Sequence, residues 1–341
     1  MKTYIKLLAF LSRTEKKTAI LILLLVTLLA LFDAFSIASI MPFIALVTNP
    51  DLIQTNEHIN YLYLLISPSN ENVFIIYVGL LVLFMVVLSN LLRMLSFYSQ
   101  VSYSYNRQLS ISVKLLNDYL ERPFEWFLTQ NTSNLSKKLL SETREITDSA
   151  ILSILNFFSY SIAIIIIVLL LALIDFFTAL IVLTIPVFIY SLIYIFVKKT
   201  LSNLGNIRMI SDKDRFKAVS ETLSGVRELN LSNNKSLMFN KYKNAAKSFA
   251  KSQILIDTFS QIPRFFIEIV AFGSLIFLII YLLYTRENIL DILPLIGLYA
   301  MAGYRMLPSA QMVYISVSKL QAVKPSIENL YKDIKYKNFT K

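Results

Sequence analysis

The sequence contains no cysteine and a single histidine, His58, and only 16% of its 341 residues are charged. Without cysteine the chain can form no disulfide, no thiolate metal site and no cysteine nucleophile, and one histidine cannot build a histidine metal cluster. Soluble domains carry about 25% charged residues. The shortage of charge, together with 56% apolar residues, indicates a chain solvated by lipid and excludes a disordered tail, a disulfide scaffold and most soluble enzymes.

Long stretches with few charges are the main feature of what the sequence does contain. A helix that crosses a membrane needs roughly 20 mainly apolar residues. Six stretches of the chain meet that length, at about residues 18–47, 72–92, 149–174, 178–197, 259–284 and 292–318. The apolar character of the first stretch continues past Asp33, so we interpret it as a retained anchor and not as a cleaved signal peptide. The sequence therefore predicts an all-α membrane protein with six transmembrane helices.

Basic residues are divided very unequally between the connections of these six stretches. Five Lys and Arg residues precede the first stretch, seven lie in 93–148, twelve in 198–258, and six follow Arg305, whereas the outer connections carry only Arg286. Basic connections stay on the cytoplasmic side of a membrane. We therefore expect a multi-pass protein of the bacterial inner membrane with both termini in the cytoplasm. The formal net charge of +11 then reflects topology, and no nucleic-acid partner is expected.

The two inner connections, 93–148 and 198–258, show apolar residues at three- and four-residue spacing and read as helices. Each is broken near its middle, the first at Pro123 and the second at Gly225, because proline and glycine end helices. The sequence thus predicts two long helical hairpins that reach into the cytoplasm, each with a short amphipathic helix at its tip. The aromatic residues of the first tip suit either an anchor on lipid headgroups or a contact for a cytoplasmic partner.

Six stretches, short outer connections and two long, broken inner connections resemble the transmembrane domain of ABC exporters of the six-helix type, over essentially the whole chain. Residues 119–134 and 221–229 are similar to the coupling-helix regions of these exporters, which dock onto nucleotide-binding domains. Residues 304–309, with Met-Pro-Phe at 41–43, are most similar to the branch that flips lipid-linked oligosaccharides. The resemblance assigns coupling to the ATPase to the following residues: Phe124, Glu125, Trp126, Phe127, Gly225, Val226, Arg227 and Glu228.

The phosphate-binding loop of an ATPase, G-x-x-x-x-G-K-[ST], is not found in the sequence, because none of its six glycines is followed by lysine. We therefore expect the chain alone to be no enzyme and to hold no cofactor, with ATP and magnesium bound only by a partner nucleotide-binding domain. Residues 1–341 are expected to be a transmembrane domain alone, whether a truncated reading frame, a membrane half with a separately encoded ATPase, or a deliberately shortened chain.

Five ionisable residues lie within or at the ends of the apolar stretches, where charge is costly and is by default functional. They are Asp33, Arg93, Arg264, Glu268 and Arg305. One interpretation is an internal network in which Arg264 pairs with Glu268 and Asp33 pairs with Arg305. Three arginines against two acids leave one guanidinium without a carboxylate, however, and guanidinium groups bind phosphate in a bidentate manner. We therefore expect the arginines to line a cavity and to bind the pyrophosphate of a lipid-linked glycan.

Taken together, the sequence predicts the membrane half of an ATP-driven transporter that acts as a homodimer, surrounded by membrane lipids, on a polyprenyl-pyrophosphate-linked oligosaccharide or a related lipid. No catalytic or metal-binding residues are expected. Two alternatives remain open. The chain could be the membrane half of an exporter for a peptide or another amphiphile, or a membrane scaffold or remnant that transports nothing.

Overall fold

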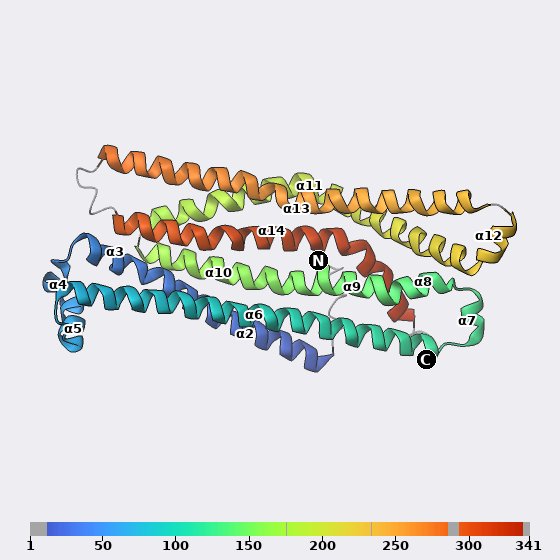
Figure 1. Ribbon diagram of the computed structural model, residues 1–341, viewed down its shortest axis with the longest axis horizontal. Coiled ribbons are helices and arrows are strands. Elements are labelled where there is room, and N and C mark those ends of the chain that lie inside the picture. The colour runs from blue at the N-terminus through green and yellow to red at the C-terminus, as the bar shows by residue number, and fades with distance from the viewer. Residues whose placement is uncertain (1–11, 175, 233, 286–292, 337–341) are drawn as a thin grey trace.

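The computed structural model of the chain describes residues 12–174, 176–232, 234–285 and 293–336, and within these ranges all regular structure is helical (Figure 1). In chain order the helices are α2 (Arg13–Ala38), α3 (Ile40–Thr48), α4 (Leu52–Thr55), α5 (Glu57–Ile66), α6 (Glu71–Leu120), α7 (Phe124–Leu128), α8 (Thr132–Lys137), η2 (Lys138–Glu142), α9 (Thr143–Ile146), η3 (Thr147–Ile151), α10 (Leu152–Ile174), α11 (Phe176–Ser224), α12 (Val226–Ser232), α13 (Lys235–Thr285) and α14 (Leu293–Tyr336). The two elements labelled η are π-helical turns.

The long helices run side by side along one axis and form an elongated bundle. Figure 1 shows α3, α4 and α5 at one end of this bundle and the short helices α7 and α12 at the opposite end. Helices α6, α11 and α13 each continue without interruption from an apolar stretch into one of the long basic connections. The prediction of two long helical hairpins, each with a short helix at its tip, is therefore confirmed.

The hairpin tips form where the sequence breaks the helices. Helix α6 ends at Leu120, shortly before Pro123, and the side-chain oxygen of Asn131 accepts a 3.0 Å hydrogen bond from the backbone N–H of Ser133 at the start of α8. Such a cap satisfies a backbone donor that the first turn of a helix leaves free. At the second tip, α11 ends immediately before Gly225. Asn233, which follows α12, lies outside the described residues.

The stretch 18–47 is divided into two helices. Helix α2 ends at Ala38, and α3 begins at Ile40 after Ser39, whose backbone N–H donates to the carbonyl of Phe35 over 3.0 Å. Pro42 lies in the first turn of α3, where its missing N–H cannot bond the carbonyl four residues back. The division therefore follows from Pro42.

Four helical stretches within the described residues have the length and apolar composition to cross a membrane: Thr14–Thr48, Glu71–Leu120, Thr132–Ile174 and Val187–Ser224. They contain the first three predicted spans and the second half of the fourth. The fifth predicted span lies within α13, and the sixth lies within α14 apart from residue 292, which is outside the described residues. The chain is therefore a multi-pass membrane protein, and the number six stays a prediction.

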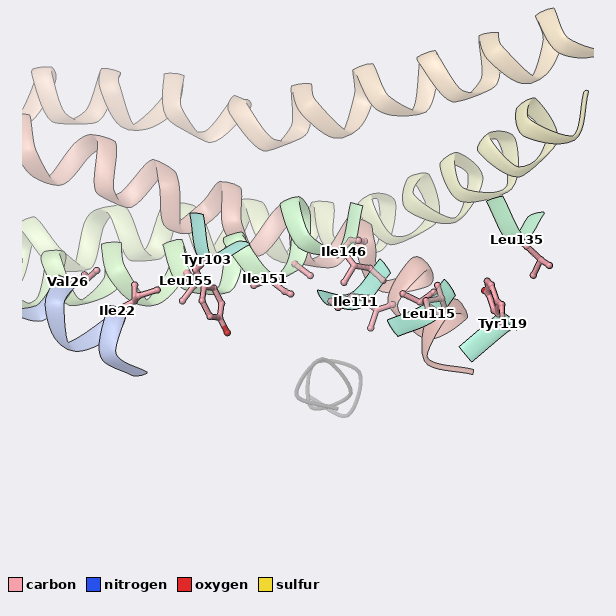
Figure 2. Packing of buried hydrophobic residues seen from close by; sticks show 14 residues of the cluster. Ile22, Val26, Tyr103, Ile111, Leu115, Tyr119, Leu135, Ile146, Ile151 and Leu155 are labelled. Carbon is pink, nitrogen blue, oxygen red and sulfur yellow. The ribbon is translucent and has the colours of Figure 1, made fainter. Parts of the chain in front are cut away.

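The largest hydrophobic core lies toward the end of the bundle that carries α7. Figure 2 shows side chains from α2, α6, α8, α9, η3 and α10 converging there, among them Ile22, Tyr103, Ile146 and Leu155. Residues of α14, such as Ile327, complete the cluster. This core packs the first hairpin against α2 and α14, so the first tip is joined to the last helix of the chain.

Candidate substrate and coupling sites

Charged side chains from three helices meet around Asp33 of α2. The hydroxyl of Ser89 and the Nη2 group of Arg93, both on α6, contact the Asp33 carboxylate. The Nη1 group of Arg305 on α14 lies 3.7 Å from Oδ1 of Asp33 and 3.5 Å from the side-chain oxygen of Asn90. We call these five residues the Asp33 cluster.

The Asp33 cluster carries more positive than negative charge. It contains two guanidinium groups and one carboxylate, so it keeps one net positive charge when all three are ionised. The Arg305 side chain is only 5% exposed, and its Nε has no hydrogen-bond partner among the described residues. Arg93, at 46% exposed, is much more accessible. A buried donor without a partner costs free energy, so the cluster is a site at which an anion would be stabilised.

Local sequence positions the α6 side of this cluster. Ser89 and Arg93 are four residues apart and therefore lie on one face of the helix, where both reach the same carboxylate. Asn90 is next to Ser89 and lies toward Arg305 of α14. Asp33 itself stands between the small buried residues Ala30 and Ala34 of α2.

Arg264 and Glu268, the two other charged residues expected at the substrate site, pair with each other on α13. Their Nε and Oε1 atoms are 2.6 Å apart, and the side chains are 50% and 39% exposed. In the part of the chain that the structure describes, no hydrogen bond or ion pair joins them to the Asp33 cluster. The structure thus brings Arg93 and Arg305 together and places Arg264 separately. Both pairs of the ion-pair interpretation are present.

The aromatic residues of the first tip divide into an inward and an outward group. Trp126 stacks on Tyr119 with 5.6 Å between ring centroids, and the guanidinium of Arg122 lies 4.2 Å from the Trp126 ring. Phe127 packs edge-on against Trp126 and, like it, against the large core. Phe124, by contrast, is 72% exposed. The inward group packs α7 against the core, and Phe124 with the neighbouring Glu125 lies at the surface.

The second tip presents a similar surface on α12. Gly225 separates α11 from α12, and its carbonyl accepts a 3.0 Å hydrogen bond from the backbone N–H of Leu229. Val226, Arg227 and Glu228 in the first turn of α12 are exposed. Both tips therefore combine exposed apolar and charged side chains at the same end of the bundle (Figure 1).

A buried ion pair that the sequence did not indicate lies close to the first tip. The Lys137 Nζ group is 2.8 Å from Oε1 of Glu142, and both side chains are at most 2% exposed. Nζ also donates to the carbonyl of Met209 on α11 over 3.0 Å, and the Asn329 amide of α14 donates to Glu142. This pair therefore ties the first hairpin to both α11 and α14.

A second set of polar contacts, centred on Glu145 of α9, also reaches α11 and α14. Arg208 of α11 pairs with Glu145 of α9, and it donates to the side-chain oxygen of Gln253 on α13 over 3.1 Å. The Ser326 hydroxyl of α14 donates to the same Glu145 carboxylate over 3.1 Å.

Within the described residues, no three His, Asp or Glu side chains are grouped so that they could hold a metal ion.

These features define a helical membrane protein with a charged cluster among apolar helices and two hairpins that end on the same side. A family model for the ABC transporter transmembrane region matches residues 18–298. The chain belongs to this family and is the membrane part of an ABC transporter. Membrane domains of this family generally work with a nucleotide-binding domain.

Proposed function

We propose that the chain is the transmembrane half of an ATP-driven transporter that flips a polyprenyl-pyrophosphate-linked oligosaccharide, or a related lipid, across the bacterial inner membrane. In this proposal six helices cross the membrane, both termini are cytoplasmic, and two copies of the chain enclose the pathway. The observation that carries the proposal is the Asp33 cluster, which holds a net positive charge among apolar helices.

The chemistry of a lipid pyrophosphate matches this cluster. The two phosphates carry negative charge and several acceptor oxygens, and guanidinium groups bind such groups by paired, charge-assisted hydrogen bonds. Arg93 is exposed enough to meet the headgroup first, and the Nε of the buried Arg305, which has no partner among the described residues, supplies a further donor. Arg264 of α13 would be a third cation that the headgroup meets along the pathway. The polyprenyl chain would remain in the surrounding bilayer.

ATP hydrolysis would be supplied by a nucleotide-binding domain, which would also hold the magnesium ion. The exposed residues of the two tips support this arrangement, because both tips lie at one end of the bundle where one partner can contact both (Figure 1). Closure of two such partners would move the tips. The hydrophobic core between α7 and α14 would then transmit that movement to the helix that carries Arg305.

The proposal is tested by measuring ATP-dependent flipping of a fluorescent polyprenyl-pyrophosphate oligosaccharide in proteoliposomes that contain the complete transporter. Arg305→Ala should abolish flipping while the protein keeps its thermal stability, since Asp33 retains Arg93 as a partner. Arg144→Ala is the control, because this arginine is 68% exposed and lies outside the cluster. Unchanged flipping by Arg305→Ala would overturn the proposal and favour an exporter of a peptide or an uncharged amphiphile.

A further inference from the structure

Asp33 and Glu268 are the acidic residues of the apolar stretches, and they differ in the helices that their ion pairs join. Glu268 pairs with an arginine one turn away on its own helix, so that pair moves as a unit. Asp33 instead contacts Arg93 of α6 and Arg305 of α14, which makes it a link between three helices. Any group that takes the place of the Asp33 carboxylate on these arginines also removes that link.

We infer that Asp33 is an internal competitor of the transported anion, so that the phosphate headgroup binds Arg305 and Arg93 by displacing the Asp33 carboxylate. This inference rests on the proposed function. The displaced carboxylate no longer holds α2 against α14, and occupation of the site is thereby converted into a change in helix packing. Selectivity follows as well, because an uncharged lipid cannot displace a carboxylate from two guanidinium groups.

Three observations support displacement over simple addition of the anion to the cluster. The contact between Asp33 and Arg305 is 3.7 Å, which is too long for a good hydrogen bond, so this half of the link is the weaker one. The Nε group of Arg305 has no partner among the described residues, so a new ligand gains a donor that Asp33 does not use. Arg93 is 46% exposed and gives the ligand access to the cluster.

A structural role for Asp33 makes the opposite prediction about its removal. If the carboxylate only offsets the cost of burying Arg305, its loss leaves a poorly compensated charge and loosens the site, and anion binding weakens or stays the same. If the carboxylate competes with the ligand, its loss frees both arginines, and anion binding becomes tighter. Binding strength therefore separates the two roles by its sign.

The test uses the full chain in lipid nanodiscs, with polyprenyl pyrophosphate, inorganic pyrophosphate and uncharged polyprenol as probes. Asp33→Asn should bind polyprenyl pyrophosphate roughly tenfold more tightly than the unsubstituted chain, which corresponds to the loss of one competing charge contact. Asp148→Asn is the control: it removes the same charge from a side chain that pairs with Arg144 outside the cluster, and it should bind as the unsubstituted chain does. Polyprenol binding should be the same for all three proteins. If Asp33→Asn also binds inorganic pyrophosphate more tightly, the phosphate alone displaces Asp33. If only the binding of polyprenyl pyrophosphate becomes tighter, the competitor is a lipid headgroup.

Arg305→Ala separates failure of this inference from failure of the proposed function. Weaker binding by Arg305→Ala together with unchanged or weaker binding by Asp33→Asn overturns the competition and leaves the proposed function standing. Unchanged binding by Arg305→Ala overturns both. If Asp33→Asn does not fold, spin labels replace it as the test, since the chain has no native cysteine to interfere. Cysteines introduced at the exposed positions Phe35 of α2 and Tyr304 of α14 should move apart when polyprenyl pyrophosphate is added, and an unchanged distance contradicts the inference.

Discussion

Gly205 of α11 lies directly against the backbone of Ala322 on α14, and a Cβ atom added at Gly205 would stand 2.8 Å from the Ala322 carbonyl carbon. The two helices therefore meet backbone to backbone at this point, which only glycine permits. The same helices are also linked through Lys137, which reaches the Met209 carbonyl on α11, and through its partner Glu142, which Asn329 of α14 contacts. The second hairpin and α14 should consequently move as one body.

Gly205→Ala should destabilise the protein by about 1–3 kcal/mol, because the added methyl group must push α11 and α14 apart. Gly273→Ala is the matched control, since a Cβ at Gly273 meets no atom within 4 Å and alanine favours helix. Denaturant unfolding in detergent micelles measures both variants. Equal stability of the two would show that α11 and α14 are not in contact at this position.

Lys137→Met should cost about 3–5 kcal/mol of stability, because it leaves the Glu142 carboxylate buried without its cation. Lys241→Met removes a cation from an exposed pair with Glu221 and should change stability by less than about 1 kcal/mol. The double variant Lys137→Met with Glu142→Leu should recover most of the loss. Denaturant unfolding measures the free energies of the three variants against the unsubstituted chain, and a cost for Lys137→Met no larger than that for Lys241→Met would contradict the burial of the pair.

Cysteine labelling can test the orientation of the bundle, since the chain has no native cysteine. Single cysteines at Glu57 of α5 and at Lys235 of α13 lie at opposite ends of the bundle (Figure 1). A membrane-impermeant maleimide added to intact cells should label position 57 only, and position 235 should react after the membrane is opened. The reverse pattern would invert the topology and place both tips outside the cell.

Phe124 and Trp126 of the first tip should respond differently to truncation. Phe124→Ala removes an exposed side chain, so it should leave thermal stability unchanged while it lowers substrate-stimulated ATP hydrolysis by the complete transporter by at least about tenfold. Trp126→Ala removes a ring that stacks on Tyr119 and packs on the core, so it should lower the melting temperature as well. Normal ATPase activity in Phe124→Ala would exclude a coupling role for this side chain.

The course of the chain could be predicted from local features. Pro123 lies shortly after the end of α6 and Gly225 directly after the end of α11, so the two tips were visible in the sequence. The pairing of Arg264 with Glu268 was equally accessible, because residues four apart on a helix are neighbours. In each of these cases the residues that determine the feature lie within about one helical turn of each other, so the sequence alone is enough to predict it.

Contacts between helices were only partly predictable. Asp33 and Arg305 stood out because charge is rare in apolar stretches, whereas Ser89 and Asn90 carry no such signal and join the cluster only through the packing of α6. The pair between Lys137 and Glu142 was missed because residues five apart do not share a face of an α-helix. The π-helical turn η2 changes the local periodicity and brings them together.

The central claim is that an anionic lipid headgroup is recognised at the Asp33 cluster and drives the transporter. The most direct measurement is ATP hydrolysis by the complete transporter in nanodiscs, with polyprenyl pyrophosphate and uncharged polyprenol of the same chain length compared at equal concentrations. We predict that only the pyrophosphate stimulates hydrolysis and that Arg305→Ala removes the stimulation but keeps the basal rate. Equal stimulation by both lipids, or stimulation that survives Arg305→Ala, would contradict the account.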